Sequence, residues 1–356
     1  MHPNYTLAPV LPAEWEPQDA VILAWPHAQS DWLANIANIQ KTYIELIRHI
    51  TRFESVVLII PDQAEKVRLQ PILLENQIAV DKVIPVFANY NDTWLRDTGP
   101  VSIKVNTEIH YLDFRFNGWG NKFDYQLDDQ LCKRLFKHFT IQPRLIEHFD
   151  IILEGGSIDS DGYGALLTTE ACLLNPNRNP TFSKDDYNNL FNDKVGVDNV
   201  HWLKYGHIIG DDTDGHIDML ARFCSANTIA YSSCEDRDDP HYESLNSMKA
   251  ELESLITADK DRYRLIDLPI PAAIYNNQNE RLAASYCNFL VINDAVLVPV
   301  YDDPNDTQVC KKLAECFPGR EIIPINALNI IQQGGSLHCL TMQLPAGSLN
   351  RYRPAN

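Results

Sequence analysis

Long hydrophobic runs are missing from this sequence, and no stretch approaches the roughly 18 apolar residues that a membrane-spanning helix needs. Residues 1–9 contain no basic segment that leads into an apolar run, as a secretory signal would require. These absences argue against a membrane-spanning or exported protein. We therefore expect a cytoplasmic protein that does not associate with a membrane.

Basic residues are scarce relative to acidic ones. Lysine and arginine number 30 against 48 aspartates and glutamates, which gives a formal net charge of −18. A surface of this charge repels nucleic acid and anionic membranes and attracts small cations. The balance argues against a nucleic-acid partner and favours a cationic ligand, although an acidic surface also simply promotes solubility.

Closely spaced cysteines are also missing. Eight cysteines are spread over the chain without a single Cys-x-x-Cys pair. A chain of 356 residues that is 45% hydrophobic can bury a large core, so it does not need disulfide bonds for stability. We expect most of these cysteines to be reduced and buried as packing residues.

No long Gly/Ser linker, low-complexity block or charge run divides the chain. We therefore expect a single domain over residues 1–356. Polar, turn-forming stretches predict surface loops near residues 115–130, 175–200 and 232–245.

What the chain does contain is a recurring strand-turn-strand pattern. Four segments have apolar or alternating residues on both sides of a short polar turn, which is typical of β-hairpins. They are residues 101–114 with a turn at Asn106-Thr107, 155–169 with a turn at residues 159–162, 217–232 with a turn at Asn227, and 288–300 with a turn at Asn293-Asp294. The turns are roughly 55 to 66 residues apart, a spacing that fits repeats of a strand, a hairpin and a helix.

The last repeat is the clearest of the series. Its expected elements are strands at residues 289–292 and 295–300, a helix at 306–316 and a strand at 321–325. Near the N-terminus the same pattern gives a strand at residues 20–25, an amphipathic helix at 35–51 and a strand at 55–60. The sequence thus predicts a mixed α/β protein built from about five such units.

Polar residues beside glycine precede or open these hairpins. They occur within residues 91–100, 153–157, 210–218 and 334–339. If the repeats surround a pseudo-rotation axis, equivalent strand ends converge on one pocket. The side chains that would meet there are Asp97, Glu154, His216, Asp218 and Cys339.

Each of these residues also has a simpler structural explanation. Asp97 fits a turn acid paired with Arg96. Glu154 fits a buried acid at a strand end, and His216 fits a hydrogen-bonded core histidine. His216 and Asp218 are two residues apart, so on a strand their side chains would share one face. Their joint recurrence at equivalent positions favours a functional site.

Cys339 has a stronger claim to reactivity than the other cysteines. Gly334 and Gly335 free the backbone before it, and Ser336 and His338 make its surroundings polar. A nucleophilic cysteine gains thiolate character from a nearby cation, a helix terminus or a cationic substrate. A bound guanidinium would itself supply that charge.

Five stretches in this chain are similar to those of the agmatine deiminase family, which belongs to the guanidine-modifying pentein superfamily together with arginine and peptidylarginine deiminases. They are residues 94–100 (WLRDTGP), 116–120 (FNGWG), 153–157 (LEGGS), 213–218 (TDGHID) and 334–339 (GGSLHC). The resemblance extends in order from about residue 14 to 345. The chain departs from the family at Gly334-Gly335-Ser336, where three glycines and an Asn are usual, and at Gly118, where another residue is common.

This resemblance implies a fold and a set of roles. The fold would be a five-bladed α/β propeller with pseudo-fivefold symmetry. Cys339 would be the nucleophile, His216 the general acid and base, and Glu154 the acid that orients His216. Asp97 and Asp218 would hold the guanidinium. The family reaction converts agmatine to N-carbamoylputrescine and ammonia through a covalent thiouronium, and it requires no metal or organic cofactor.

Agmatine is favoured over arginine partly by the resemblance and partly by charge. The α-carboxylate of arginine calls for a basic partner, whereas the distal ammonium of agmatine suits acidic and aromatic walls. Candidate wall residues are Trp94, Trp119, Asp211 and Asp212. Trp119 equally fits the core of a blade, and the aspartates equally fit turn caps.

Three alternatives remain at this stage. A metal-dependent hydrolase would use an oxygen-rich site of Asp211, Asp212, Asp214, His216 and Asp218. The same cysteine site would also serve amidino transfer or the deimination of arginine or an acylated agmatine. A propeller without catalysis would only bind its ligand. The sequence leaves the oligomeric state open, a homo-oligomer included.

Overall fold

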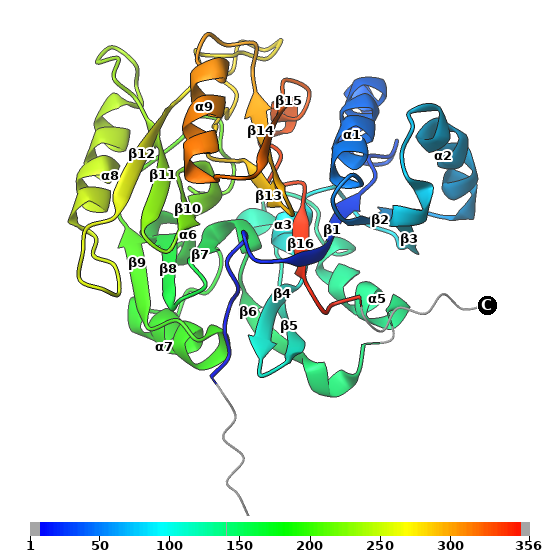
Figure 1. Cartoon of the computed structure of the whole chain (residues 1–356), viewed down its shortest axis with the longest axis horizontal. Coiled ribbons are helices and arrows are strands. Elements are labelled where there is room, and N and C mark those ends of the chain that lie inside the picture. Colours follow the sequence, from blue (N-terminus) through cyan, green and yellow to red (C-terminus); the bar gives the residue numbers. More distant parts are fainter. Residues whose placement is uncertain (1–7, 140, 350–356) are drawn as a thin grey trace, which may run out of the picture.

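Five small β-sheets surround the middle of the molecule in the computed structural model, which describes residues 8–139 and 141–349 (Figure 1). The first sheet has the strand order β16-β1-β2-β3, and the other sheets have three strands each in chain order. The strands are β1 Gln18–Ala24, β2 Ser55–Ile60, β3 Val83–Phe87, β4 Val101–Val105, β5 Glu108–Arg115, β6 Ile146–Ile152, β7 Ile158–Ser160, β8 Ala165–Thr169, β9 Asn199–Leu203, β10 Ala221–Ser225, β11 Thr228–Ser233, β12 Arg264–Pro269, β13 Leu290–Ile292, β14 Ala295–Val300, β15 Glu321–Asn326 and β16 Met342–Pro345.

The same connection recurs in every sheet. A first strand pairs antiparallel with a second, and the second pairs parallel with a third after a helical crossover. The crossover helices are α1 Ile36–Ile50, α5 Leu131–His138, α7 Lys184–Val195, α8 Tyr242–Ser254 and α9 Asp306–Cys316. The remaining α-helices are α2 Gln63–Glu75, α3 Leu95–Thr98, α4 Gly118–Asn121 and α6 Glu170–Leu173. The expected five-bladed α/β propeller is therefore confirmed.

The first blade is closed by the two ends of the chain. Its first strand is β16, near the C-terminus, which pairs antiparallel with β1 near the N-terminus. The other blades take all their strands from consecutive sequence. The ring is thus completed only when residues more than three hundred positions apart meet, as in the pair Ile22 and Met342.

Most of the expected elements match the structure closely. Helix α9 has the predicted bounds, and Val309 and Leu313, four residues apart on one face, are fully buried against the blade. The hairpins at Asn106-Thr107 and Asn293-Asp294 also turn where the polar residues predicted. Three-residue β13 and six-residue β14 are buried along nearly their whole length, which explains their continuous apolar sequence.

Three local expectations were wrong. The expected loop at residues 175–200 contains α7, because Ser183 and Asp186 form a capping box and Tyr187, Phe191 and Val195 give the helix a buried face. The second hairpin turns at residues 161–164 and not at 159–162.

The third error concerns the segments that carry the candidate site residues. His216 and Asp218 do not lie on a strand, because residues 217–219 form a 3-10 helix and β10 begins only at Ala221. Cys339 likewise precedes the last strand, which begins at Met342. Gly215 (φ +89°) and Gly334 (φ +83°) adopt left-handed backbone conformations that interrupt an extended chain.

Within residues 8–139 and 141–349, the structure contains no helix with the length and apolar character needed to cross a membrane.

Candidate active site

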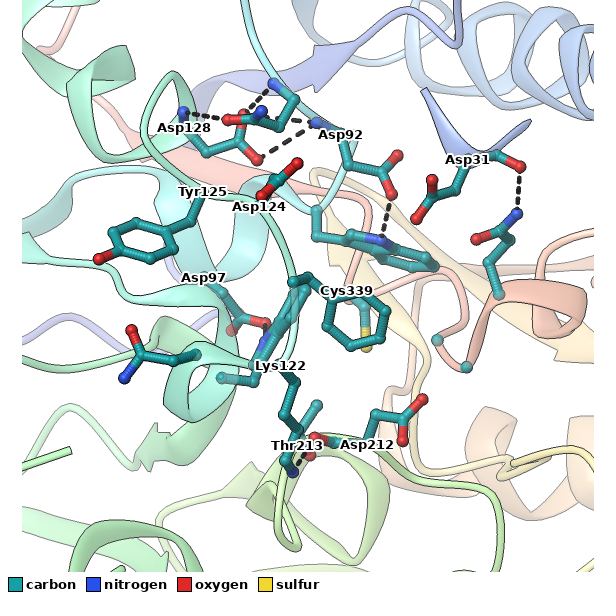
Figure 2. A pocket seen from close by; sticks show the side chains of 18 of the residues that line it. Asp31, Asp92, Asp97, Lys122, Asp124, Tyr125, Asp128, Asp212, Thr213 and Cys339 are labelled. Atoms are coloured by element: carbon teal, nitrogen blue, oxygen red, sulfur yellow. Dashed lines mark hydrogen bonds between the residues drawn. The ribbon is translucent and has the colours of Figure 1, made fainter. Parts of the chain in front are cut away.

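A cavity of about 680 Å³ opens at the centre of the blades. Its lining residues come from segments far apart in the sequence: Gln29, Asp31, Asn91, Asp92, Trp94, Asp97, Trp119, Asn121, Lys122, Phe123, Asp124, Tyr125, Gln126, Asp128, Asp212, Thr213, Gln333, Gly334, Gly335 and Cys339. Figure 2 shows Asp97 and Cys339 in the middle of this cavity, between Asp92 and Asp128 on one side and Asp212 on the other.

Cys339 lies on the cavity floor, 5% exposed, in the turn that follows Gly334 and Gly335. A Cβ atom at Gly335 would overlap the ring of Trp94, so only glycine fits this approach. The Asn288 amide donates to Cys339 Sγ at 3.2 Å, and the thiol donates to Asp218 Oδ2 at 3.5 Å. Burial raises the pKa of the Cys339 thiol well above its usual value, and the charges of Asp218 and Asp97 add to this shift.

Asp97 is positioned by the short helix α3 and is buried beside the thiol. Its Oδ2 accepts a hydrogen bond from Trp119 Nε1, and its Oδ1 accepts one from the Gly156 backbone N–H, both at 2.9 Å. Burial raises its pKa, although the charge of His216 opposes the shift. These two donors fix the carboxylate plane toward the cavity.

Asp218 is fully buried and stands next to the sulfur. Its Oδ2 accepts a hydrogen bond from His338 Nδ1 at 2.8 Å. Burial would raise its pKa, but this hydrogen bond and the nearby positive charges outweigh burial and lower it. Oδ1 is buried without a hydrogen-bond partner among the described residues, so it is available to a ligand.

His216 is fully buried, and within the described part of the chain neither ring nitrogen has a hydrogen-bond partner. Its Nδ1 lies 3.6 Å from Asp97 Oδ1. Burial disfavours the charged ring, yet the neighbouring Asp97, Cys172 and Glu154 hold its pKa well above the usual value. A Cβ at Gly156 would lie 2.6 Å from Nδ1, so glycine is required for the ring to sit here.

Glu154 is near His216 but forms its hydrogen bonds elsewhere. Arg178 Nε donates to both of its carboxylate oxygens, at 2.8 and 3.0 Å. The two terminal nitrogens of the Arg178 guanidinium bind the loop before His216: Nη1 donates to Asp214 Oδ2 at 2.7 Å, and Nη2 donates to the Thr213 carbonyl at 2.8 Å. Arg178 therefore connects the buried acid to the loop at the cavity edge.

One group among the described residues has metal-ligand spacing: a Glu154 oxygen, Cys172 Sγ and a His216 nitrogen all lie within 4.8 Å of one another. Both Glu154 oxygens already bind Arg178, so a cation would have to displace a guanidinium.

The alternative metal set on the loop before His216 does not converge. Asp211 accepts hydrogen bonds from Thr213 and from the Gly215 N–H, and Asp214 is engaged by Arg178 and Lys122. These aspartates stabilise the loop, as a turn cap would.

The expected wall residues divide into two groups. Trp94, Trp119 and Asp212 line the cavity, whereas Asp211 does not. Trp94 donates from its ring nitrogen to Asp92 Oδ2 at 3.2 Å. Trp119 has a left-handed backbone (φ +52°), held by the hydrogen bond between its indole and Asp97.

The cavity wall is strongly acidic. It carries six aspartates and, among the described residues, one basic side chain, Lys122. Lys122 donates to the Asp212 carbonyl at 2.6 Å and to Asp214 at 2.8 Å, so its charge is already paired. Burial raises the pKa of Asp92 to about 7 and that of Asp128 to about 8, so both are partly protonated near neutral pH in the empty cavity, and a bound cation would favour their ionised forms. The geometry therefore suits a cationic ligand.

Sequence reasoning missed Arg178 and Asn288. Asn288 lies at the start of the last predicted hairpin, and its Oδ1 accepts backbone hydrogen bonds from His338 and Cys339 at 2.9 and 3.3 Å. Arg178 follows α6 in a stretch of asparagines and prolines that reads as a loop. No spacing in the sequence connects either residue to its partner.

Comparison with known proteins places this site in a family. Residues 10–345 match the family described as Porphyromonas-type peptidyl-arginine deiminase. An agmatine deiminase of Pseudomonas aeruginosa and a putative agmatine deiminase of Yersinia pestis are each 33% identical to the chain, over 94% of it and 95% of their own lengths.

Solved structures give the same result. A C. jejuni agmatine deiminase variant with substrate bound superimposes with a TM-score of 0.87 at 38% identity, over 97% of this chain and 98% of the other. The agmatine deiminase of Enterococcus faecalis gives 0.85 at 27% identity, over 96% of each chain. The chain therefore belongs to the Porphyromonas-type peptidyl-arginine deiminase family, the group of the pentein superfamily that includes the agmatine deiminases.

Proposed function

We propose that this protein is an agmatine deiminase, which hydrolyses agmatine to N-carbamoylputrescine and ammonia. The observation that carries the proposal is the buried thiol of Cys339 in the cavity lining, with Asp97 lining the same cavity and the fully buried carboxylate of Asp218 in contact with the sulfur. The relatives named agmatine deiminase, which match nearly the whole chain, support agmatine as the substrate.

The two carboxylates would bind the guanidinium of the substrate. A guanidinium is planar, presents a fork of N–H donors and stays protonated because its pKa exceeds about 12. Asp218 Oδ1 is buried without a partner among the described residues, and Asp97 faces the cavity. Pairing with both carboxylates offsets the loss of hydration and fixes the central carbon against the sulfur.

The bound cation would also activate the thiol. The burial and negative neighbours that raise the pKa of Cys339 keep it protonated while the site is empty. A guanidinium placed between Asp97 and Asp218 reverses the local field, so Cys339 loses its proton to solvent and the thiolate attacks the central carbon. An S–C bond forms, and the carbon becomes tetrahedral.

His216 would move the protons of the reaction. Its pKa is held well above the usual value, so it starts as an imidazolium and donates a proton to the leaving nitrogen. The C–N bond breaks, ammonia departs and a covalent thiouronium remains on Cys339. Neutral His216 then takes a proton from water, whose oxygen attacks the same carbon. The hydroxyl group on that carbon then gives its proton to solvent as the carbonyl forms, the C–S bond breaks, and the ureido product and the thiolate are released.

The charge of the cavity favours agmatine over arginine. The α-carboxylate of arginine would enter a wall of aspartates, and Lys122 is already paired with Asp214 and the Asp212 carbonyl. The distal ammonium of agmatine instead finds acidic and aromatic neighbours such as Asp92 and Trp94. The competing reactions are the deimination of arginine, the deimination of an acylated agmatine, and amidino transfer to an amine.

The test measures ammonia and ureido product from agmatine and from arginine, with an added amine in a third reaction. Wild type is compared with Cys339→Ala and with Cys310→Ala, which removes a half-buried cysteine of α9 outside the cavity. We expect turnover of agmatine by wild type and Cys310→Ala only. Turnover of arginine but not agmatine would refute agmatine as the substrate. An active Cys339→Ala would refute Cys339 as the nucleophile.

A further inference from the structure

A chain of charged side chains leads away from Cys339, and the proposed reaction uses only its first member, Asp218. His338, the neighbour of Cys339, is 1% exposed, and each of its ring nitrogens faces a carboxylate. Nδ1 lies 2.8 Å from Asp218 Oδ2, and Nε2 lies 2.6 Å from Glu14 Oε1. His338 thus connects Glu14 to the carboxylate that contacts the sulfur.

Glu14 comes from the segment before β1, which from residue 8 onward contains no strand and whose backbone meets the second blade at the isolated bridge between Val10 and Lys104 of β4. This segment crosses the middle of the molecule before it enters β1 (Figure 1). The Leu11 N–H donates to the Val195 carbonyl, and Ser160 Oγ donates to the Leu11 carbonyl, so the segment is tied to the third blade. Glu14 therefore reaches the site from outside the strands and loops that carry the other site residues.

The groups around His338 define its hydrogen bonds. Burial would raise the pKa of Glu14, but Arg222, His338 and Arg96 outweigh burial and hold it well below the usual value. The pKa of Asp218 is also lowered. Both carboxylates are therefore ionised and can only accept hydrogen bonds, so both ring nitrogens of His338 must donate. The cations that face this group are Arg96, whose Nε donates to the His338 carbonyl, and Arg222, which binds Glu14.

We infer that Glu14 is a positioning residue, which holds His338 as a doubly hydrogen-bonded imidazolium and thereby aims the Asp218 carboxylate at the guanidinium and Cys339. The inference rests on the proposed deiminase function. His338 occupies Asp218 Oδ2 and leaves Oδ1 for the substrate. Without the Glu14 carboxylate, the ring loses its second charged acceptor, and the Asp218 carboxylate loses the constraint on its rotation.

Two measurements on Glu14→Gln test this role. The first is the ¹⁵N–¹H spectrum of ring-labelled histidine, recorded for both proteins, wild type and variant, at the same pH. We expect two ring N–H protons on His338 in wild type and one in Glu14→Gln. The second is steady-state kinetics with agmatine, where we expect a tenfold to hundredfold loss that lies mainly in kcat, because a small misplacement at a reacting centre costs about that much.

The matched control is Glu16→Gln. Glu16 belongs to the same segment but pairs with Lys104 at the surface, away from His338. It should leave both the His338 spectrum and kcat at wild-type values. A single ring proton on His338 in wild type would overturn the inference, and so would a wild-type kcat in Glu14→Gln.

Two further outcomes are distinguishable. If Glu14→Gln does not fold, Glu14→Asp takes its place, because it keeps the negative charge but has a side chain one methylene shorter. A reduced kcat in Glu14→Asp supports the positioning role, and an unchanged kcat overturns it. If wild type turns over no guanidine at all, the proposed function fails and the positioning role fails with it, whereas the His338 spectrum still establishes whether Glu14 holds an imidazolium.

Discussion

Among single residues, Cys339 is placed where a thiol is hard to ionise. Burial and the nearby Asp218 and Asp97 raise its pKa, whereas reactive cysteines commonly gain their thiolate from a resident cation. A site that becomes reactive only with a cationic substrate would protect its nucleophile from oxidants and alkylating agents while it is empty. The carboxylates that we propose as the guanidinium ligands would thus also keep the free thiol protonated.

This arrangement predicts a slow and pH-dependent alkylation. In the free protein, iodoacetamide should modify Cys339 slowly at neutral pH and faster only above the ordinary cysteine pKa of about 8.5, because the folded-state pKa is raised. Asp218→Asn removes the first negative neighbour, lowers that pKa and should speed alkylation at a fixed pH. The rate is measured by mass spectrometry of the Cys339 peptide.

The control for this experiment is Asp212→Asn. Asp212 also lines the cavity but is not among the groups that shift the Cys339 pKa most. It should leave the alkylation rate nearly unchanged. Rapid alkylation of wild type at neutral pH would contradict a substrate-assisted thiolate.

At the scale of elements, the turn that carries Trp119 shapes the cavity wall, and consecutive residues of its backbone have positive φ. Gly118 and Gly120 have φ of +65° and +90°, and Trp119 between them also has a positive φ. The turn aims the indole N–H at Asp97. A Cβ on Gly118 would overlap the Phe123 carbonyl, so the turn cannot accept alanine without moving.

Gly118→Ala should therefore weaken both folding and substrate binding. We expect a loss of about 1–2 kcal/mol of stability from the left-handed backbone, together with a raised KM because the Trp119 contact to Asp97 shifts. Gly319→Ala is the matched control: its φ is +90°, and nothing lies within 4 Å of the added Cβ. It should lose comparable stability with an unchanged KM, and equal kinetics in both variants would contradict the role of the turn.

Elements with a strong local pattern could be predicted from the sequence, and those set by single contacts could not. The apolar spacing of α9 and the hairpin at Asn293-Asp294 are local properties, so their bounds were correct. The expectation of a strand at His216 was wrong because Gly215, in a left-handed conformation, and the following 3-10 helix interrupt it. Within residues 8–139 and 141–349, the segments that carry the candidate site residues are turns and short helices between strands.

For the whole molecule, the five-unit repeat in the sequence predicts a central pocket where equivalent strand ends converge. Recurring polar residues at equivalent positions predicted that Asp97, Glu154 and Cys339 lie close together, and the structure brings them to one site. Arg178, Asn288 and Glu14 could not be predicted, because each acts through a partner far away in the sequence. Such contacts depend on the ring being closed.

The way in which the ring is closed predicts cooperative unfolding, and we propose that residues 1–356 behave as one domain. Strand β16 completes the first blade, so loss of the pair β16–β1 opens the ring. Far-ultraviolet circular dichroism reports the unfolding of all blades. Tryptophan fluorescence reports mainly the first blade, because four of the six tryptophans lie between Trp15 and Trp94. In urea, both signals of wild type should change in one coincident transition. Leu344→Ala, in buried β16, should lower the free energy of unfolding by about 2–5 kcal/mol and move both transitions to lower urea concentration together. A fluorescence transition that precedes the dichroism transition would show that the first blade unfolds by itself, and would contradict a single domain.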